Sequence, residues 1–262
     1  MGRLKGNLTE SQVSEYTIKS LKENPVGVIQ YPILEFDDEA LKLLSDGVAE
    51  TLKYSKCVPK GGWLYRNAKR TLDIVLSALG LILLSPVMGI TALAIYLDDG
   101  GAPIFSQIRV TKSGKMFRMY KFRSMCIDAE EQFAEVQKRN ESEGLAFKAK
   151  DDPRITRIGR FIRKTSIDEL PQLWNILKGD MSIVGIRPPL PREVVLYTPH
   201  EIDRLHVKAG LGTMAQAAGR SSLPFDAWTD MDIEYIENRS LWMDTKIFFK
   251  MILAVLRRKG AL

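Results

Sequence analysis

The fold is decided by residues 72–97, LDIVLSALGLILLSPVMGITALAIYL, in which the only charge is Asp73 near the start. At about 1.5 Å of rise per residue, a helix of this length crosses a hydrocarbon core roughly 30 Å thick. Ser85 and Pro86 lie in its middle, and a proline there removes a backbone hydrogen bond and kinks the helix. The Ser85 hydroxyl is near enough to pair with the carbonyl that the proline leaves free.

Basic residues flank this apolar stretch on both sides. Upstream lie Lys56, Lys60, Arg66, Lys69 and Arg70, and residues 109–123 downstream are rich in Lys and Arg and contain no acid. Positive residues prefer the cytoplasmic side of a membrane. Two interpretations therefore stay open: a single spanning helix, or a re-entrant helix-break-helix over residues 63–98 that enters and leaves by one face. A hairpin buried in a soluble core fits so apolar a run less well.

The remaining sequence predicts a mostly helical α+β protein. Residues 1–62 form an N-terminal extension of unassigned role, and residues 99–262 form the second part of the chain. The predicted elements are a strand at 26–34, an amphipathic helix at 37–56, a strand at 103–110, a basic amphipathic helix at 154–164, and helices at 168–178 and 244–260. The last helix is apolar with basic ends, which suits either the membrane interface or the underside of a folded core.

Composition narrows the class of partner. The net charge of +6 and the pI of about 9.2 predict an anionic partner, which is nucleic acid, anionic lipid or a phosphorylated substrate. Cys57 and Cys126 have neither metal-type spacing nor a CxxC pair, so no disulfide framework is predicted. The polar N-terminus does not resemble a signal peptide.

Candidate chemistry concentrates in residues 164–188, KTSIDELPQLWNILKGDMSIVGIRP. Pro171 is tolerated only in the first turn of a helix, which places the helix start near Asp168. Gly179 is a typical helix stop. Helical spacing predicts a buried stripe made of Leu170, Leu173, Trp174 and Leu177.

A carboxylate at this helix start lies at the positive end of the helix dipole, where phosphate also binds. Positive charge to separate the two anions is available from Arg163, Lys164, Arg187 and a divalent cation. The structural alternative is a capping box of Ser166 and Glu169, with Asp168 as a simple cap. Adjacent carboxylates on a helix point about 100° apart, so functional roles for Asp168 and Glu169 would differ.

Several motifs follow one another in order along the chain. They are KRTLDIVLSALGLILLSP (69–86), YKFRSM (120–125), DDPRITRIGRFIRKTSIDELPQLWNILKGDMSIVG (151–185), Arg187-Pro188, and GRSS…DIEYIENRSLWMDTKI (219–247). In these residues the chain resembles the bacterial sugar transferase family, the monotopic phosphoglycosyl transferases. These enzymes are also called undecaprenyl-phosphate sugar-phosphotransferases.

The resemblance implies a membrane-embedded re-entrant helix broken at Ser85-Pro86. It implies a catalytic domain with amphipathic interfacial helices at the cytoplasmic face of the bacterial inner membrane. The implied reaction transfers a sugar-1-phosphate from a UDP-sugar to polyprenyl (undecaprenyl) phosphate, with Mg²⁺, and initiates polysaccharide or glycoconjugate synthesis. Asp168 matches the nucleophile, which would form a covalent aspartyl phosphosugar and expel UMP in a ping-pong reaction.

The resemblance also assigns supporting residues. Glu169 matches the second member of the dyad and would share the metal with Asp168. Residues matching phosphate-binding positions are Arg163 and Arg187, and further candidates are Lys121 and Arg123, for which an interfacial basic face is the alternative. The nucleotide-sugar side matches Gly219, Arg220 and Ser221, for which a plain turn is the alternative.

Two places depart from the family pattern. Ile186 replaces the usual proline before Arg187, and residues 208–212 read KAGLG where the family has KPGLT. Because proline fixes φ, its loss predicts looser loops around Arg187 and the sugar pocket.

Two other functions compete with catalysis. The basic amphipathic stretches would also suffice for a non-catalytic, membrane-anchored lipid-binding or scaffold protein. Nucleic-acid binding is not predicted, because no recognised binding motif accompanies the positive charge. The sequence identifies neither the sugar nor the oligomeric state.

Overall fold

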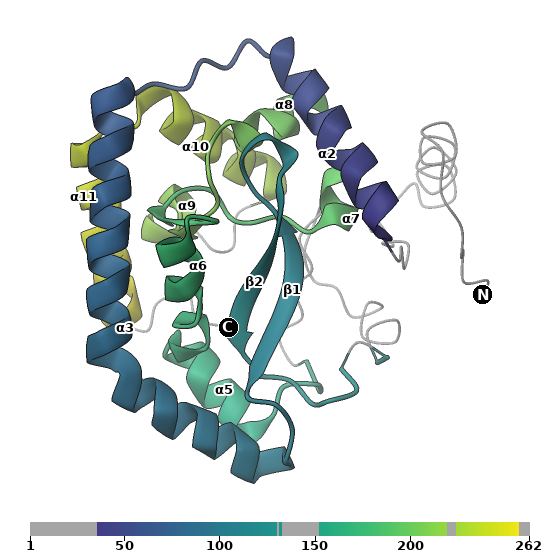
Figure 1. Cartoon of the computed structure of the whole chain (residues 1–262), viewed down its shortest axis with the longest axis vertical. Helices are drawn as coiled ribbons and strands as arrows, with labels where there is room; N and C mark the ends of the chain where they lie inside the picture. The colour runs from purple at the N-terminus through teal and green to yellow at the C-terminus, as the bar shows by residue number, and fades with distance from the viewer. Residues whose placement is uncertain (1–35, 130, 133–151, 219–223, 257–262) are drawn as a thin grey trace.

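The computed structural model describes residues 36–129, 131–132, 152–218 and 224–256 (Figure 1). Within these ranges the chain is mostly helical and contains two small two-stranded sheets, which confirms the coarse fold class. The strand predicted at 26–34 lies outside the described residues.

The apolar stretch forms the long helix α3, Trp63–Asp99, which ends at Gly100 in the left-handed conformation. In the described part of the chain, α3 is the helix whose length and composition are sufficient to cross a membrane. Figure 1 shows it running along one side of the molecule and then bending to pass beneath it. The chain stays helical through Pro86, so a bend within one helix replaces the predicted break.

The bend has the hydrogen bond that the sequence predicted. Pro86 has no N–H to donate to the carbonyl of Ile82, four residues earlier. The Ser85 hydroxyl donates to that carbonyl instead, over 2.8 Å. A free polar group is thereby avoided on a helix whose outer side chains, such as Ile82 and Leu83, are mostly exposed.

Two polar side chains near the start of α3 anchor it to the rest of the molecule. Arg70 donates to the carbonyls of Ile176 and Leu177, both at 2.7 Å. The buried Asp73 carboxylate accepts hydrogen bonds from the Ser182 hydroxyl at 3.1 Å and from the Ile183 amide at 2.9 Å. The only charge of the apolar run is therefore a structural acceptor inside the fold.

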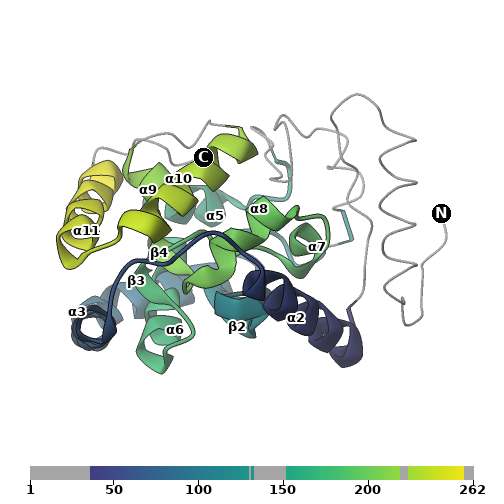
Figure 2. The same ribbon diagram turned by 90° about the horizontal axis from the view of Figure 1, so that it is seen from above.

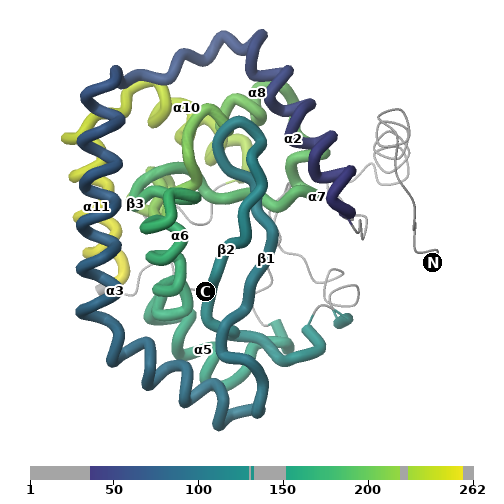
Figure 3. Tube along the Cα trace, viewed as in Figure 1, coloured from purple at the N-terminus to yellow at the C-terminus, as the bar shows by residue number. Residues whose placement is uncertain are grey.

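Strands β1, Ile104–Val110, and β2, Met116–Phe122, form an antiparallel hairpin at the centre of the molecule (Figure 3). The predicted strand is thus confirmed. Strands β3, Ser182–Val184, and β4, Gly210–Gly212, pair in parallel as the second sheet.

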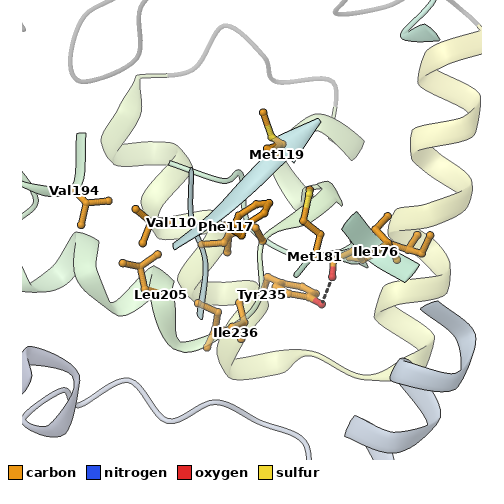
Figure 4. Close-up of a cluster of buried hydrophobic side chains, with 14 of the residues drawn as sticks. Val110, Phe117, Met119, Ile176, Met181, Val194, Leu205, Tyr235 and Ile236 are labelled. Atoms are coloured by element: carbon orange, nitrogen blue, oxygen red, sulfur yellow. Dashed lines mark hydrogen bonds between the residues drawn. The ribbon is translucent and has the colours of Figure 1, made fainter. Parts of the chain in front are cut away.

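Helices surround the hairpin (Figures 1 and 2). In chain order they are α2 Asp38–Lys53, α5 Arg157–Lys164, α6 Gln172–Lys178, α7 Pro191–Val194, α8 Pro199–Ile202, α9 Met214–Ala217, α10 Phe225–Asn238 and α11 Leu241–Leu256, with 3₁₀ turns η1 Lys112–Gly114, η3 Ile167–Glu169 and η4 Asp203–His206. The core gathers side chains from the hairpin, from α6 and from α10, including Phe117, Ile176 and Tyr235 (Figure 4).

The predicted helix at 37–56 is present as α2, and its residue Val48 is buried in this same core. Part of the N-terminal extension therefore packs on the second part of the chain. At the other end, α11 buries Ile247 and exposes Trp242 and Phe249, so one face packs on the core and the other is free for an interface.

The buried stripe predicted on the helix after Asp168 is wrong at Trp174, whose exposed fraction is 50%. The α-helix begins at Gln172 rather than at Asp168, and its inward face includes the fully buried Asn175. The side-chain oxygen of Asn175 accepts a hydrogen bond from the Tyr120 N–H at 3.0 Å, and its side-chain nitrogen donates to the Arg118 carbonyl at 2.8 Å. These bonds to β2 fix which side of α6 faces inward.

Candidate active site

Asp168 lies in the 3₁₀ turn η3 between α5 and α6, where its exposed fraction is 8%. The preceding Ser166 has φ of 56°, in the left-handed region, and its side chain makes no capping hydrogen bond. The capping-box alternative is therefore wrong. A strained residue two positions before a buried carboxylate is typical of a site that the surrounding structure holds in place.

Lys121, on β2, faces both members of the dyad. Its ammonium lies 2.8 Å from a carboxylate oxygen of Glu169 and 3.9 Å from one of Asp168. Burial raises the pKa of Asp168 to about 6, although the Lys121 ammonium favours its ionised form. Neighbouring carboxylates with different exposure, one buried and one partly solvated, are suited to different roles.

Arg163, near the end of α5, is the second cation beside Asp168. Its Nε donates to the Ser124 hydroxyl at 2.9 Å, which holds the guanidinium against the end of the hairpin. This contact depends on Gly159, because a Cβ there would lie 1.9 Å from the Ser124 carbonyl oxygen. Glycine therefore permits the close approach of α5 to the residues after β2.

A cavity of about 300 Å³ opens beside Asp168. Most of its charged lining is basic, and the two carboxylates are those of Asp168 and Glu193. The lining cations are Arg109, Lys121, Arg123, Arg154, Arg163, Arg187 and Arg192. A small cavity with this excess of positive charge is suited to bind phosphorylated compounds.

The structure brings most of the predicted site residues together. Arg163, Arg187, Lys121 and Arg123 all line the cavity with Asp168, whereas Glu169 is held beside it through Lys121. Arg123 also pairs with Asp99 at the end of α3. The predicted segment Gly219, Arg220 and Ser221 lies outside the described residues.

Arg187 is held from two sides. Its Nη1 atom lies 3.8 Å from a carboxylate oxygen of the buried Glu193, and its Cζ atom lies 5.8 Å from the centroid of the Trp228 ring. Ile186, which replaces the usual proline, has a fully buried side chain, and its backbone carbonyl accepts a hydrogen bond from the Gly210 N–H at 2.8 Å. The looser loops expected from the missing proline stay a prediction.

Four further cavity residues were not predicted from the sequence: Arg109, Arg154, Arg192 and Glu193. For Arg109 a signal was available in the alternation along the hairpin. Phe105 pairs with Lys121 and Arg109 pairs with Phe117, so all four side chains share one face of the sheet. The other three reach the cavity through contacts between distant segments, which no local pattern shows.

Comparison with known proteins identifies the family of this chain. A family profile described as bacterial sugar transferase matches residues 64–258. The chain belongs to the bacterial sugar transferase family. Its similarity to the members described below extends over about three quarters of its length.

Three relatives illustrate the similarity of this family member. The galactosyl transferase CpsE of Streptococcus agalactiae is 46% identical over 198 residues, 74% of this chain and 43% of the relative. The undecaprenyl-phosphate galactose phosphotransferase of Salmonella typhimurium is 45% identical over 206 residues, 75% of this chain and 42% of the relative. The UDP-galactose-lipid carrier transferase of Erwinia amylovora is 43% identical over 201 residues, with the same two shares. The chain therefore spans less than half the length of these relatives.

The family resemblance implies Mg²⁺, and two carboxylates of this chain would suit it. Mg²⁺ commonly takes one or two carboxylates and completes its shell with water and substrate phosphate oxygens. Asp168 and Glu169 offer two carboxylates on the same side of Lys121. In the described ranges no cluster of three or more acidic, His or Cys side chains exists, so an all-protein metal cage is not formed there.

Proposed function

We propose that this protein transfers a sugar-1-phosphate from a UDP-sugar to polyprenyl (undecaprenyl) phosphate and releases UMP. The observation that carries the proposal is a buried carboxylate, Asp168, in a small cavity walled by cations. Two of the relatives are named as a phosphotransferase and as a lipid carrier transferase, and these names support the same reaction class. The product would start synthesis of a polysaccharide or glycoconjugate.

In the first step, a carboxylate oxygen of Asp168 attacks the phosphorus that carries the sugar. A bond forms between that oxygen and phosphorus, the bond to the bridging oxygen of the diphosphate breaks, and UMP leaves with the electron pair. In the second step, a phosphate oxygen of the lipid attacks the aspartyl phosphosugar, and Asp168 leaves as a carboxylate. Mg²⁺ held by Asp168 and Glu169 would neutralise charge on the phosphate oxygens.

Two basic side chains near Asp168 support this scheme. Arg163, fixed by Ser124, is positioned to neutralise the phosphate under attack. Lys121 favours the ionised, nucleophilic form of Asp168. Charge-assisted hydrogen bonds that exist before the substrate arrives stabilise a transition state without costly reorganisation.

We further propose that α3 is re-entrant, and that the cavity faces the cytoplasmic side of the bacterial inner membrane. The exposed apolar side chains along α3 and the basic residues at both flanks support this topology. Single cysteines placed before Lys69 and after Leu97 are expected to react with a thiol reagent from one membrane face. Labelling from opposite faces would exclude the re-entrant arrangement.

The function is tested with detergent-solubilised full chain, a panel of UDP-sugars, Mg²⁺ and undecaprenyl phosphate. We expect UMP release together with a lipid-linked sugar, for at least one sugar of the panel. Membrane binding without UMP release from any donor would instead support the non-catalytic lipid-binding alternative.

We expect Lys121→Met to move the acidic limb of the pH profile of kcat/KM to higher pH. In the native protein this limb should lie near pH 6, because Asp168 must be ionised to attack. Removing the ammonium raises the pKa of Asp168, so less of the carboxylate is ionised at pH 7 and kcat/KM falls there. The measurement is initial UMP release from about pH 5 to pH 9.

The matched control is Lys115→Met, at the turn of the same hairpin and outside the Asp168 cavity. It should leave the limb in place. If Lys121→Met also leaves the limb in place, Lys121 does not set the ionisation of the nucleophile.

A further inference from the structure

The cavity contains two groups of charges at different points along the hairpin. Asp168 interacts electrostatically with Lys121, Glu169 and Arg163. The second group surrounds Arg109 and contains Glu193, Arg187 and Arg192. Lys121 pairs with Phe105, and Arg109 lies four residues further along β1. At about 3.3 Å per residue, the backbone positions of Lys121 and Arg109 are therefore separated by roughly 13 Å along the sheet.

Arg109, a member of the second group, has a buried guanidinium whose hydrogen bonding is incomplete. Its two terminal nitrogens donate to the Pro188 carbonyl at 2.9 Å and to the Gln107 side-chain oxygen at 2.8 Å, and both acceptors are neutral. Among the residues that the structure describes, its Nε atom is buried without a hydrogen-bond partner. Burial lowers the pKa of the guanidinium to about 10, so it remains charged at neutral pH. Glu193 is the carboxylate that attracts Arg109, whereas Arg187 and Arg192 repel it, so the group has an excess of positive charge. A bound anion would offset the cost of burying that excess.

The reaction supplies such an anion. In phosphoryl transfer, the attacking and leaving oxygens lie roughly in line on opposite sides of the phosphorus, and negative charge develops on the leaving group. With the attacked phosphate at Asp168, the leaving phosphate extends along the cavity toward the second group. A guanidinium there gains most from the bond breaking, because its charge meets the growing charge of the departing group.

We propose that Arg109 binds the phosphate that departs with the nucleoside, as a second phosphate subsite distinct from the one at Asp168 and Arg163. This inference rests on the proposed function for the direction of transfer. Arg187 lines the same end of the cavity, where the buried Glu193 holds it in place. The subsite is expected to bind the phosphate of nucleoside monophosphates and to make no contribution to binding of the nucleoside alone.

The experiment measures equilibrium binding of UMP and of uridine to the detergent-solubilised full chain. Arg109→Met and Arg109→Lys are expected to weaken UMP binding by about tenfold or more, and to leave uridine binding unchanged. The lysine variant retains the charge and loses the fork of donors, and it keeps the test valid if the methionine variant does not fold. Each variant's thermal transition, with and without UMP, reports folding and binding in one sample. Arg160→Gln, on the exposed face of α5, is the matched control and should bind UMP normally.

Kinetics separate the two possible sources of phosphate. In a ping-pong reaction, kcat/KM for each substrate reports its own half-reaction, so the Arg109 variants should lower kcat/KM for the UDP-sugar and spare that for the lipid. Unchanged UMP affinity in both variants overturns the proposal. A loss confined to the lipid substrate also overturns it, by assigning the subsite to the lipid phosphate. If the native protein transfers no sugar but UMP binding still depends on Arg109, the proposed function fails and the subsite stands.

Discussion

Asp168→Asn is expected to lower kcat by roughly 10⁴-fold or more, which is the scale reached when a covalent nucleophile is removed. Asparagine keeps the shape of the side chain, but its neutral amide cannot attack phosphorus. The expected readout is loss of UMP release, together with loss of the sugar-phosphate adduct that intact-mass measurement should detect on the native protein. UMP binding should remain, since Arg109 and Arg187 are untouched.

Stability provides an internal control for this variant. The folded-state pKa of Asp168 is raised above its unfolded value, so the ionised form is disfavoured by folding at neutral pH. Replacing it with a neutral amide should leave the melting temperature unchanged or higher. Asp180→Asn, which removes a partly exposed carboxylate outside the cavity, should retain full turnover. Near-native turnover in Asp168→Asn would show that this carboxylate does not form the intermediate.

Asp232→Ala is expected to destabilise the protein by about 3–5 kcal/mol, the usual cost of leaving one partner of a buried ion pair alone. Asp232, on α10, accepts from Arg204 Nε at 2.9 Å, and both side chains are almost completely buried. The Tyr197 hydroxyl also contacts the guanidinium, at 3.0 Å. Without Asp232, the buried charge would lose its direct carboxylate partner and keep Tyr197, the Phe225 ring and the electrostatic attraction of Glu193.

Thermal unfolding in detergent measures this loss. Asp230→Asn is the matched control, because it lies on the same helix and its side chain is 72% exposed where it pairs with His200. The control should change stability by no more than about 0.5 kcal/mol. A double variant with leucine at both Arg204 and Asp232 should recover much of the loss, since it removes the unpaired charge. A small effect of Asp232→Ala would mean that water reaches Arg204.

Patterns within one stretch of sequence were sufficient to predict several helices and strands. Hydropathy predicted α3, a strand was predicted at 103–110 where β1 lies, and the Ser85 hydroxyl was predicted as the partner of the carbonyl freed by Pro86. The start of α6 was predicted four residues too early, because a 3₁₀ turn and an α-helix share the same tolerance for Pro171. Trp174 was predicted inside because helical spacing cannot show that Asn175 pairs with β2.

The candidate site was only partly predictable for a different reason. Asp168 and Arg163 lie in one motif, so a single stretch of sequence identified both. Arg109 and Glu193 join them through the fold, and the bond from Arg109 to Pro188 connects residues 79 positions apart. Alternation along the hairpin indicates the face on which Arg109 lies, but neither segment carries a periodic signal for the contact itself.

The two polar anchors of α3 limit how the protein can be divided. Arg70 donates hydrogen bonds to carbonyls at the end of α6, and Asp73 accepts one from the backbone N–H of Ile183 in β3. A fragment beginning after residue 99 would lose both sets of bonds, so a water-soluble version cannot be made by simple truncation. Replacing α3 with an unrelated hydrophobic helix would still bring the chain to a lipid surface. It would not restore the hydrogen bonds that Arg70 and Asp73 make to α6 and β3.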